Sequence, residues 1–137
     1  MAGILIVLIC IFLFACKKSS SSAAAAPDIS VLSGVWICSQ WVYPGDTLEY
    51  SFNTSAMNAT DIYMNPHTYG YKVGDIVLTG ISTTSTVNTF TCTAQVRSGS
   101  NNSVLSTGTI RLVLQNNILT AKYSDISGYG DLTFVKK

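Results

Sequence analysis

The feature that most constrains the fold of this chain is strict alternation of apolar and polar residues in two segments. Residues 89–97 alternate over their whole length, with the apolar members at the even-numbered positions. Residues 47–53 alternate in the same way, with Leu48, Tyr50 and Phe52 as the apolar members. Because successive side chains of a β-strand point to opposite faces, this period of two predicts strands with one buried face.

Turn-forming residues divide the rest of the chain into further short apolar segments. These segments cover residues 35–43, 62–64, 69–73, 76–81, 104–114, 118–123 and 131–135. Asn116 and Asn117 are expected to form a hairpin turn, because Asn tolerates a positive φ. About eight strands at this spacing predict an all-β domain, an antiparallel meander closed into a barrel, with an open β-sandwich as the alternative. Closure would leave no edge strand open to aggregation.

Length and charge limit the number of domains and the class of partner. The 137 residues allow one domain behind an export segment, and we place that domain at residues 30–137. Charged residues make up 11% of the chain and the formal net charge is +1. A nucleic-acid-binding protein normally carries a basic stripe, and this sequence has none, so a nucleic-acid partner is not expected.

The N-terminus has the composition of an export signal followed by a tether. Residues 4–15 form an uncharged apolar run, shorter than the roughly 20 residues that a membrane-spanning helix requires. This length is typical of the apolar core of a signal peptide, which we place at residues 1–15. Residues 16–29 contain the sequence KKSSSSAAAAP and have little to bury, so they are expected to form a flexible tether.

The junction between these two segments, Leu13-Phe14-Ala15-Cys16, resembles the lipobox of bacterial lipoproteins. The resemblance implies that the signal peptide is cut before Cys16, and that Cys16 receives the acyl chains. Several acyl chains together give a stable membrane anchor. The expected location is the cell envelope, at the outer membrane of a Gram-negative bacterium.

The start of the domain, Leu32-Ser33-Gly34-Val35-Trp36, resembles the L-x-G-x-W start of lipocalin-like domains. The resemblance implies a lipocalin-like barrel in which Trp36 lies near a closed end. It also implies a non-enzymatic binder of a small apolar or amphipathic ligand, although it assigns no ligand-binding residue. The alternative function is a structural or interaction module of the envelope that docks a protein or a glycan.

Few residues suggest further chemistry. Cys38 and Cys92 are expected to face the core, either joined by a disulfide or as two separate buried thiols. His67 is the only histidine. No G-x-S-x-G elbow accompanies it, so no catalytic residues and no enzyme are expected. Residues 125–131 have oxygen ligands for calcium but lack the EF-hand spacing, so no metal or other cofactor is expected.

Aromatic side chains are the other candidates for a binding surface. Those near expected loops or strand ends are Trp41, Tyr43, Tyr63, Tyr69, Tyr71 and Tyr129. Exposed aromatic rings can stack on sugars or line an apolar pocket. Ordinary packing within a β-protein explains them as well, and it is the interpretation that we favour.

Overall fold

The computed structural model describes residues 28–40, 47–64, 71–97 and 103–137, and these form an all-β domain. Its strands are β1 (Gly34–Gln40), β2 (Leu48–Asn53), β3 (Asn58–Met64), β4 (Ile76–Thr83), β5 (Thr89–Arg97), β6 (Val104–Gln115), β7 (Ile118–Ala121) and β8 (Leu132–Lys136). Two short 3-10 helices, η1 (Ile29–Leu32) and η2 (Tyr123–Asp125), accompany them. The expected signal peptide, Cys16 and most of the tether lie outside the described residues. No helix in the described ranges is long and apolar enough to cross a membrane.

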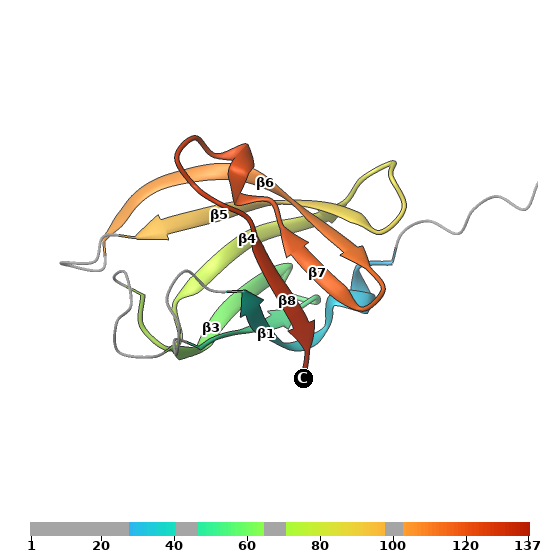
Figure 1. Cartoon of the computed structure of the whole chain (residues 1–137), viewed down its shortest axis with the longest axis horizontal. Coiled ribbons are helices and arrows are strands. Elements are labelled where there is room, and N and C mark those ends of the chain that lie inside the picture. The colour runs from blue at the N-terminus through green and yellow to red at the C-terminus, as the bar shows by residue number, and fades with distance from the viewer. Residues whose placement is uncertain (1–27, 41–46, 65–70, 98–102) are drawn as a thin grey trace, which may run out of the picture.

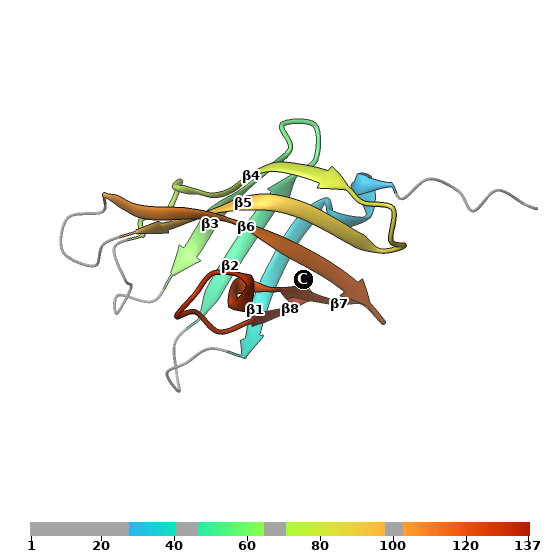
Figure 2. The ribbon, with the colours of Figure 1, turned by 90° about the horizontal axis from the view of Figure 1, so that it is seen from above.

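The strands form a closed antiparallel meander, as Figures 1 and 2 show from two sides. Each strand pairs with the next in the sequence, and β8 pairs back with β1. The closing ladder places Trp36 opposite Lys136 and Ile37 opposite Val135. The predicted barrel is therefore confirmed, and the structure is not the open sandwich that was the alternative. The barrel is consistent with the lipocalin-like architecture that residues 32–36 suggested.

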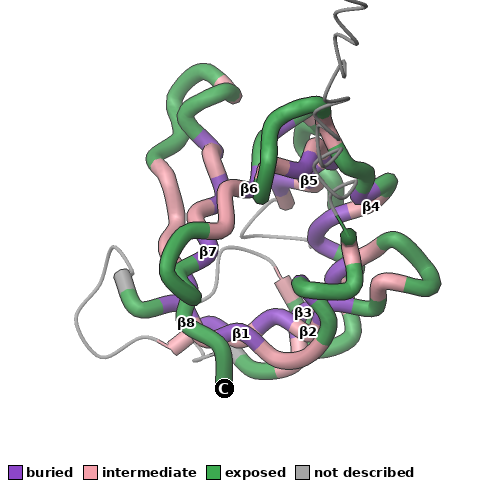
Figure 3. The backbone as a smooth tube through the Cα atoms, turned by 90° about the vertical axis from the view of Figure 1, so that its right-hand side faces the viewer, coloured by how far each residue is buried: buried purple, intermediate pink, exposed green. Residues whose placement is uncertain are grey.

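The core follows from the alternation in the sequence. In β5, Phe90, Cys92, Ala94 and Val96 are buried, whereas the residues between them are half-buried. The same alternation holds in β2. Seen end-on in Figure 3, the strands form a ring with buried positions on the strands around it. The even-numbered side chains of β5 thus fill the barrel interior.

The helix η1 lies at one end of the barrel, on the right in Figure 1, and we call this the η1 end. Trp36 is 1% exposed there, and its indole Nε1 donates a hydrogen bond of 2.7 Å to the carbonyl oxygen of Leu32. The ammonium group of Lys136 lies 5.5 Å from the centre of the Trp36 ring. Trp36, on β1, therefore contacts both η1 and β8.

The turns explain where the strands end. Asn116 and Asn117 adopt φ values of 51° and 62°, so the predicted hairpin turn between β6 and β7 is confirmed. The strands β1, β3, β5 and β7 all run from the η1 end to the opposite end, which we call the far end. Gly74, at the far end, has a φ of 96°, a conformation that favours glycine.

Three sequence-based boundaries were wrong. Residues 58–60 were expected to be a polar connection, but they are the first part of β3 and pair with β2. Their side chains include only one apolar group, Ala59, so the strand signal there was weak. Residues 71–73 are not a strand, and β7 ends at Ala121 because the chain turns into η2.

Candidate functional site

The most unusual residue of the barrel interior is Asp61 on β3. It is 0% exposed and is the only buried polar or charged residue in the described part of the chain. Its Cα lies opposite that of Tyr50 on β2, and both side chains are buried. The Asp61 amide donates to the carbonyl oxygen of Asp75 at 2.9 Å, and its carbonyl accepts from the Gly74 amide at 2.8 Å. These backbone bonds hold the carboxyl group on the inner face of the barrel.

Neither oxygen of the Asp61 carboxyl group has a hydrogen-bond partner among the residues that the structure describes. Burial raises its pKa to about 7, and the nearby carboxylate of Asp75 adds to the increase. The backbone amide of Tyr63 lies close enough to oppose the shift, but it does not reach hydrogen-bond geometry. A buried polar group without a partner costs about 1–3 kcal/mol, so its presence requires an explanation.

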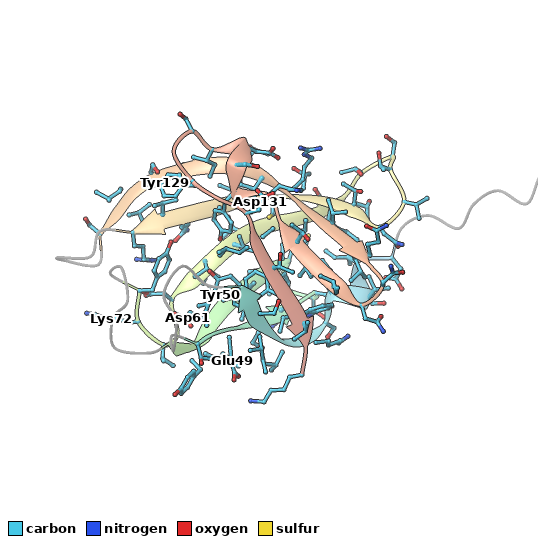
Figure 4. All side chains as sticks on the ribbon, in the orientation of Figure 1. Glu49, Tyr50, Asp61, Lys72, Tyr129 and Asp131 are labelled. Carbon is cyan, nitrogen blue, oxygen red and sulfur yellow. The ribbon has the colours of Figure 1, made fainter. Side chains whose placement is uncertain are left out.

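Three tyrosines surround this part of the interior. The hydroxyl groups of Tyr50 and Tyr123 hydrogen-bond to each other, and the Tyr71 hydroxyl donates to the carbonyl oxygen of Gln95 at 2.9 Å. Asp61 acts electrostatically on both Tyr50 and Tyr71. Figure 4 shows Tyr50 and Asp61 next to each other, on the side of the barrel away from η1. Burial raises the pKa of all three tyrosines, which keeps them neutral.

An ion pair lies at the far end, beyond Asp61. The Arg97 Nε lies 3.6 Å from Asp75 Oδ2, and both side chains are largely buried. Asp75 Oδ2 also accepts a hydrogen bond of 2.8 Å from the Lys72 amide. Arg97 Nη2 donates to Gln95 Oε1 at 3.0 Å. Among the described residues, this part of the barrel therefore contains the carboxyl groups of Asp61 and Asp75 and the guanidinium group of Arg97.

The two cysteines that the sequence placed in the core are indeed buried. The structure draws no disulfide between Cys38 and Cys92. Burial raises the pKa of Cys92 to about 12, so its thiol stays protonated. Both lie near the Tyr123 hydroxyl and contribute to the rise in its pKa.

The acidic residues of the segment that was considered for calcium are engaged with cations. Arg111 Nε lies 2.9 Å from Asp125 Oδ2, and Lys122 Nζ lies 2.6 Å from Asp131 Oδ2. Hydrogen bonds from Lys122 and Ser124 hold the pKa of Asp131 at about 2. Within the described residues, no group of three or more His, Cys, Asp or Glu side chains could hold a metal ion.

Three of the aromatic candidates lie within the described residues, and they differ in exposure. Tyr71 packs against the core, whereas Tyr63 and Tyr129 are 54% and 42% exposed. The remaining candidates, Trp41, Tyr43 and Tyr69, lie outside the described residues, as does His67.

Sequence reasoning did not find Asp61. It stands directly before the apolar group 62–64, at a distance of two residues from Ala59. This spacing of two residues puts Asp61 on the same strand face as Ala59. It becomes informative only when β3 is known to begin at Asn58.

Comparisons of the chain with protein-family models, with curated proteins and with solved structures each find no match. Support for a function therefore comes from the barrel and its interior. The arrangement offers a carboxyl group with open acceptor positions, surrounded by neutral tyrosines and apolar side chains. Such a group can bind a ligand that donates hydrogen bonds.

Proposed function

We propose that this chain is an exported, membrane-anchored binding protein whose barrel takes up a small amphipathic ligand. The observation that carries the proposal is the Asp61 carboxyl group, which is buried inside a closed eight-stranded barrel and has no hydrogen-bond partner in the described part of the chain. Ligand sites are mostly apolar with a few polar groups that fix orientation, and barrels of this size can hold one small ligand. The buried apolar residues of the barrel and the Asp61 carboxyl group are the groups that such a ligand would contact.

The location that we propose rests on the sequence alone. The lipobox-like Leu13-Phe14-Ala15-Cys16 and the Ser- and Ala-rich tether support attachment to an envelope membrane through Cys16. Incorporation of a radiolabelled fatty acid in a bacterial host tests this part. We expect the wild-type chain to be labelled and Cys16→Ala to be unlabelled; equal labelling of the two would refute the anchor.

The binding function is tested by native mass spectrometry of the full chain purified from bacterial envelopes. We expect a bound small molecule in the wild type and its loss in Asp61→Asn. Glu49→Gln is the matched control, since it also removes one carboxylate, but from a group that hydrogen-bonds to the Lys137 ammonium at 3.1 and 3.2 Å. A protein that carries no ligand, and takes none up from an envelope extract, would contradict the proposal.

A second candidate function, docking of a protein or glycan, is favoured by one observation on β6. Val104 and Leu105 are 45% and 65% exposed, and β6 pairs with β7 only from Leu112 to Gln115. Within the described ranges, no strand pairs with this edge of β6 before Leu112, so the first part of β6 offers apolar side chains beside it. Docking at β6 is tested by placing a photo-crosslinking residue at position 105. The same residue at position 87, at the η1 end, is the control. One defined adduct from position 105 alone would favour docking over ligand binding.

A further inference from the structure

We propose that the ligand of this barrel carries a protonated amine, and that the Asp61 carboxylate binds this amine beside the rings of Tyr50 and Tyr71. The inference rests on the proposed function and names the ligand class of the same site. It follows from three features: the open acceptors of Asp61, the charge balance around it, and the bonds already made by the tyrosines.

The acceptors of Asp61 are available to a donor on a ligand. An ionised carboxylate only accepts hydrogen bonds, and neither Asp61 oxygen receives one from a described residue. A ligand carboxylate or phosphate would be repelled, whereas a hydroxyl group would leave the buried charge in place. An ammonium group donates hydrogen bonds and neutralises the charge at the same time, which gives the strongest class of hydrogen bond.

The charge balance also favours a cation. None of the ion pairs among the described residues includes Asp61, and the nearby guanidinium group of Arg97 lies 3.6 Å from Asp75. Ionisation of Asp61 adds one negative charge to the barrel interior, and no cation among the described residues forms an ion pair with it. One ammonium group would bring this charge to zero, and a buried charge is tolerated only when it is paired.

The hydroxyl groups of the tyrosines are already hydrogen-bonded, so their rings are the part available to contact the rest of the ligand. The Tyr71 hydroxyl donates its proton to the Gln95 carbonyl oxygen, and the hydroxyls of Tyr50 and Tyr123 bond to each other. None of these hydroxyls donates to Asp61. Aromatic rings attract cations over their faces and pack against apolar carbon atoms, so they suit an amphipathic amine.

Binding of an amine must be linked to the loss of one proton from Asp61. Among the described residues, the titratable groups that act electrostatically on Asp61 are Tyr50, Tyr71 and Asp75. Arg97 lies beside Asp75, and Tyr123 lies beside Tyr50. Because burial raises the pKa of Asp61 to about 7, the carboxyl group is mostly protonated at pH 5.5 and mostly ionised at pH 7.5. The amine should therefore bind about 20-fold more tightly at pH 7.5 than at pH 5.5.

Three probes with one aromatic skeleton test the inference: 2-phenylethylammonium, 2-phenylethanol and phenylacetate. Binding to the full chain in lipid nanodiscs is measured by equilibrium dialysis at both pH values, with protein-free nanodiscs as the blank. We expect the ammonium probe to bind most tightly and to show the 20-fold dependence on pH. Asp61→Asn should weaken its binding by about 10- to 100-fold at pH 7.5, whereas Glu49→Gln should leave it unchanged.

The outcomes separate the inference from the proposed function. Equal binding of the three probes, or pH-independent binding of the ammonium probe, would overturn the amine assignment and leave a general amphipathic binder. If none of the probes binds and no ligand copurifies, both the amine assignment and the proposed binding function would be overturned. The pH dependence is measured on the wild-type chain, so the test stands even if Asp61→Asn does not fold.

Discussion

The buried carboxyl group of Asp61 should make the barrel less stable as the pH rises. Burial raises its pKa in the folded state to about 7, whereas an exposed aspartate has the ordinary value of 3.8. Below pH 4 both the folded and the unfolded chain hold the proton, and the contribution of Asp61 to stability is fully present. As the pH rises toward and through 7, the unfolded chain loses this proton first, so that contribution is lost.

The size of this effect follows from the shift in pKa. A difference of about three pH units corresponds to about 4 kcal/mol at 1.36 kcal/mol per unit. Domains of this size are stable by only about 5–15 kcal/mol, so the effect is a large fraction of the total. A bound cation would cancel it, because the cation favours the ionised form that the empty barrel disfavours.

Urea unfolding of the wild type, Asp61→Asn and Glu49→Gln, followed by circular dichroism between pH 4 and pH 8, measures this contribution. We expect the free energy of unfolding of Asp61→Asn, relative to the wild type, to rise by about 4 kcal/mol over this range. Asparagine does not titrate, so its own cost is a constant offset. Glu49→Gln should show the same decrease in the free energy of unfolding with rising pH as the wild type, because it retains Asp61. Parallel curves for the wild type and Asp61→Asn would refute the argument, because the carboxyl group would then titrate normally.

Three further predictions concern the packing of the barrel. A β-carbon at Gly108 would lie 2.6 Å from two carbons of the Ile126 side chain, so Gly108→Ala should lower the free energy of unfolding by about 1–3 kcal/mol. Adding Ile126→Ala should remove most of that loss in a double-mutant cycle, and simple additivity would contradict the contact. The buried Cys92 thiol, with its pKa of about 12, should resist iodoacetamide at pH 8 until the barrel unfolds, and rapid labelling of the folded protein would count against its burial. Asn117, at a φ of 62°, should tolerate Gly, whereas Asn117→Ala should lower the melting temperature, and equal melting temperatures would argue against the turn.

The part of the fold that could be predicted from sequence is the part governed by local patterns. Alternation identified β2 and β5, because one face of each strand is buried and the other is not. The pair Asn116-Asn117 identified the β6–β7 hairpin, because its backbone requires two positive φ values. These signals lie within a few residues of each other and do not depend on the rest of the chain.

The features that sequence did not predict depend on contacts between distant segments. The start of β3 at Asn58 is set by pairing with β2, and its mostly polar residues give little sign of a strand. The environment of Asp61 is set by Tyr50 across the ladder and by Asp75 on the next connection, so its burial follows from the closed barrel. Whether Cys38 and Cys92 are bonded depends on the separation of β1 and β5, which no local pattern encodes.

The most direct test of the account is the pKa of the Asp61 carboxyl group, measured by carbon-13 NMR with and without saturating 2-phenylethylammonium. The account predicts a pKa of about 7 in the free protein and a decrease toward the ordinary range when the amine is bound, because the cation stabilises the ionised form. An elevated pKa that the amine leaves unchanged would contradict binding at Asp61. A pKa near 4 in the free protein would contradict the buried, unpartnered carboxyl group on which the account rests.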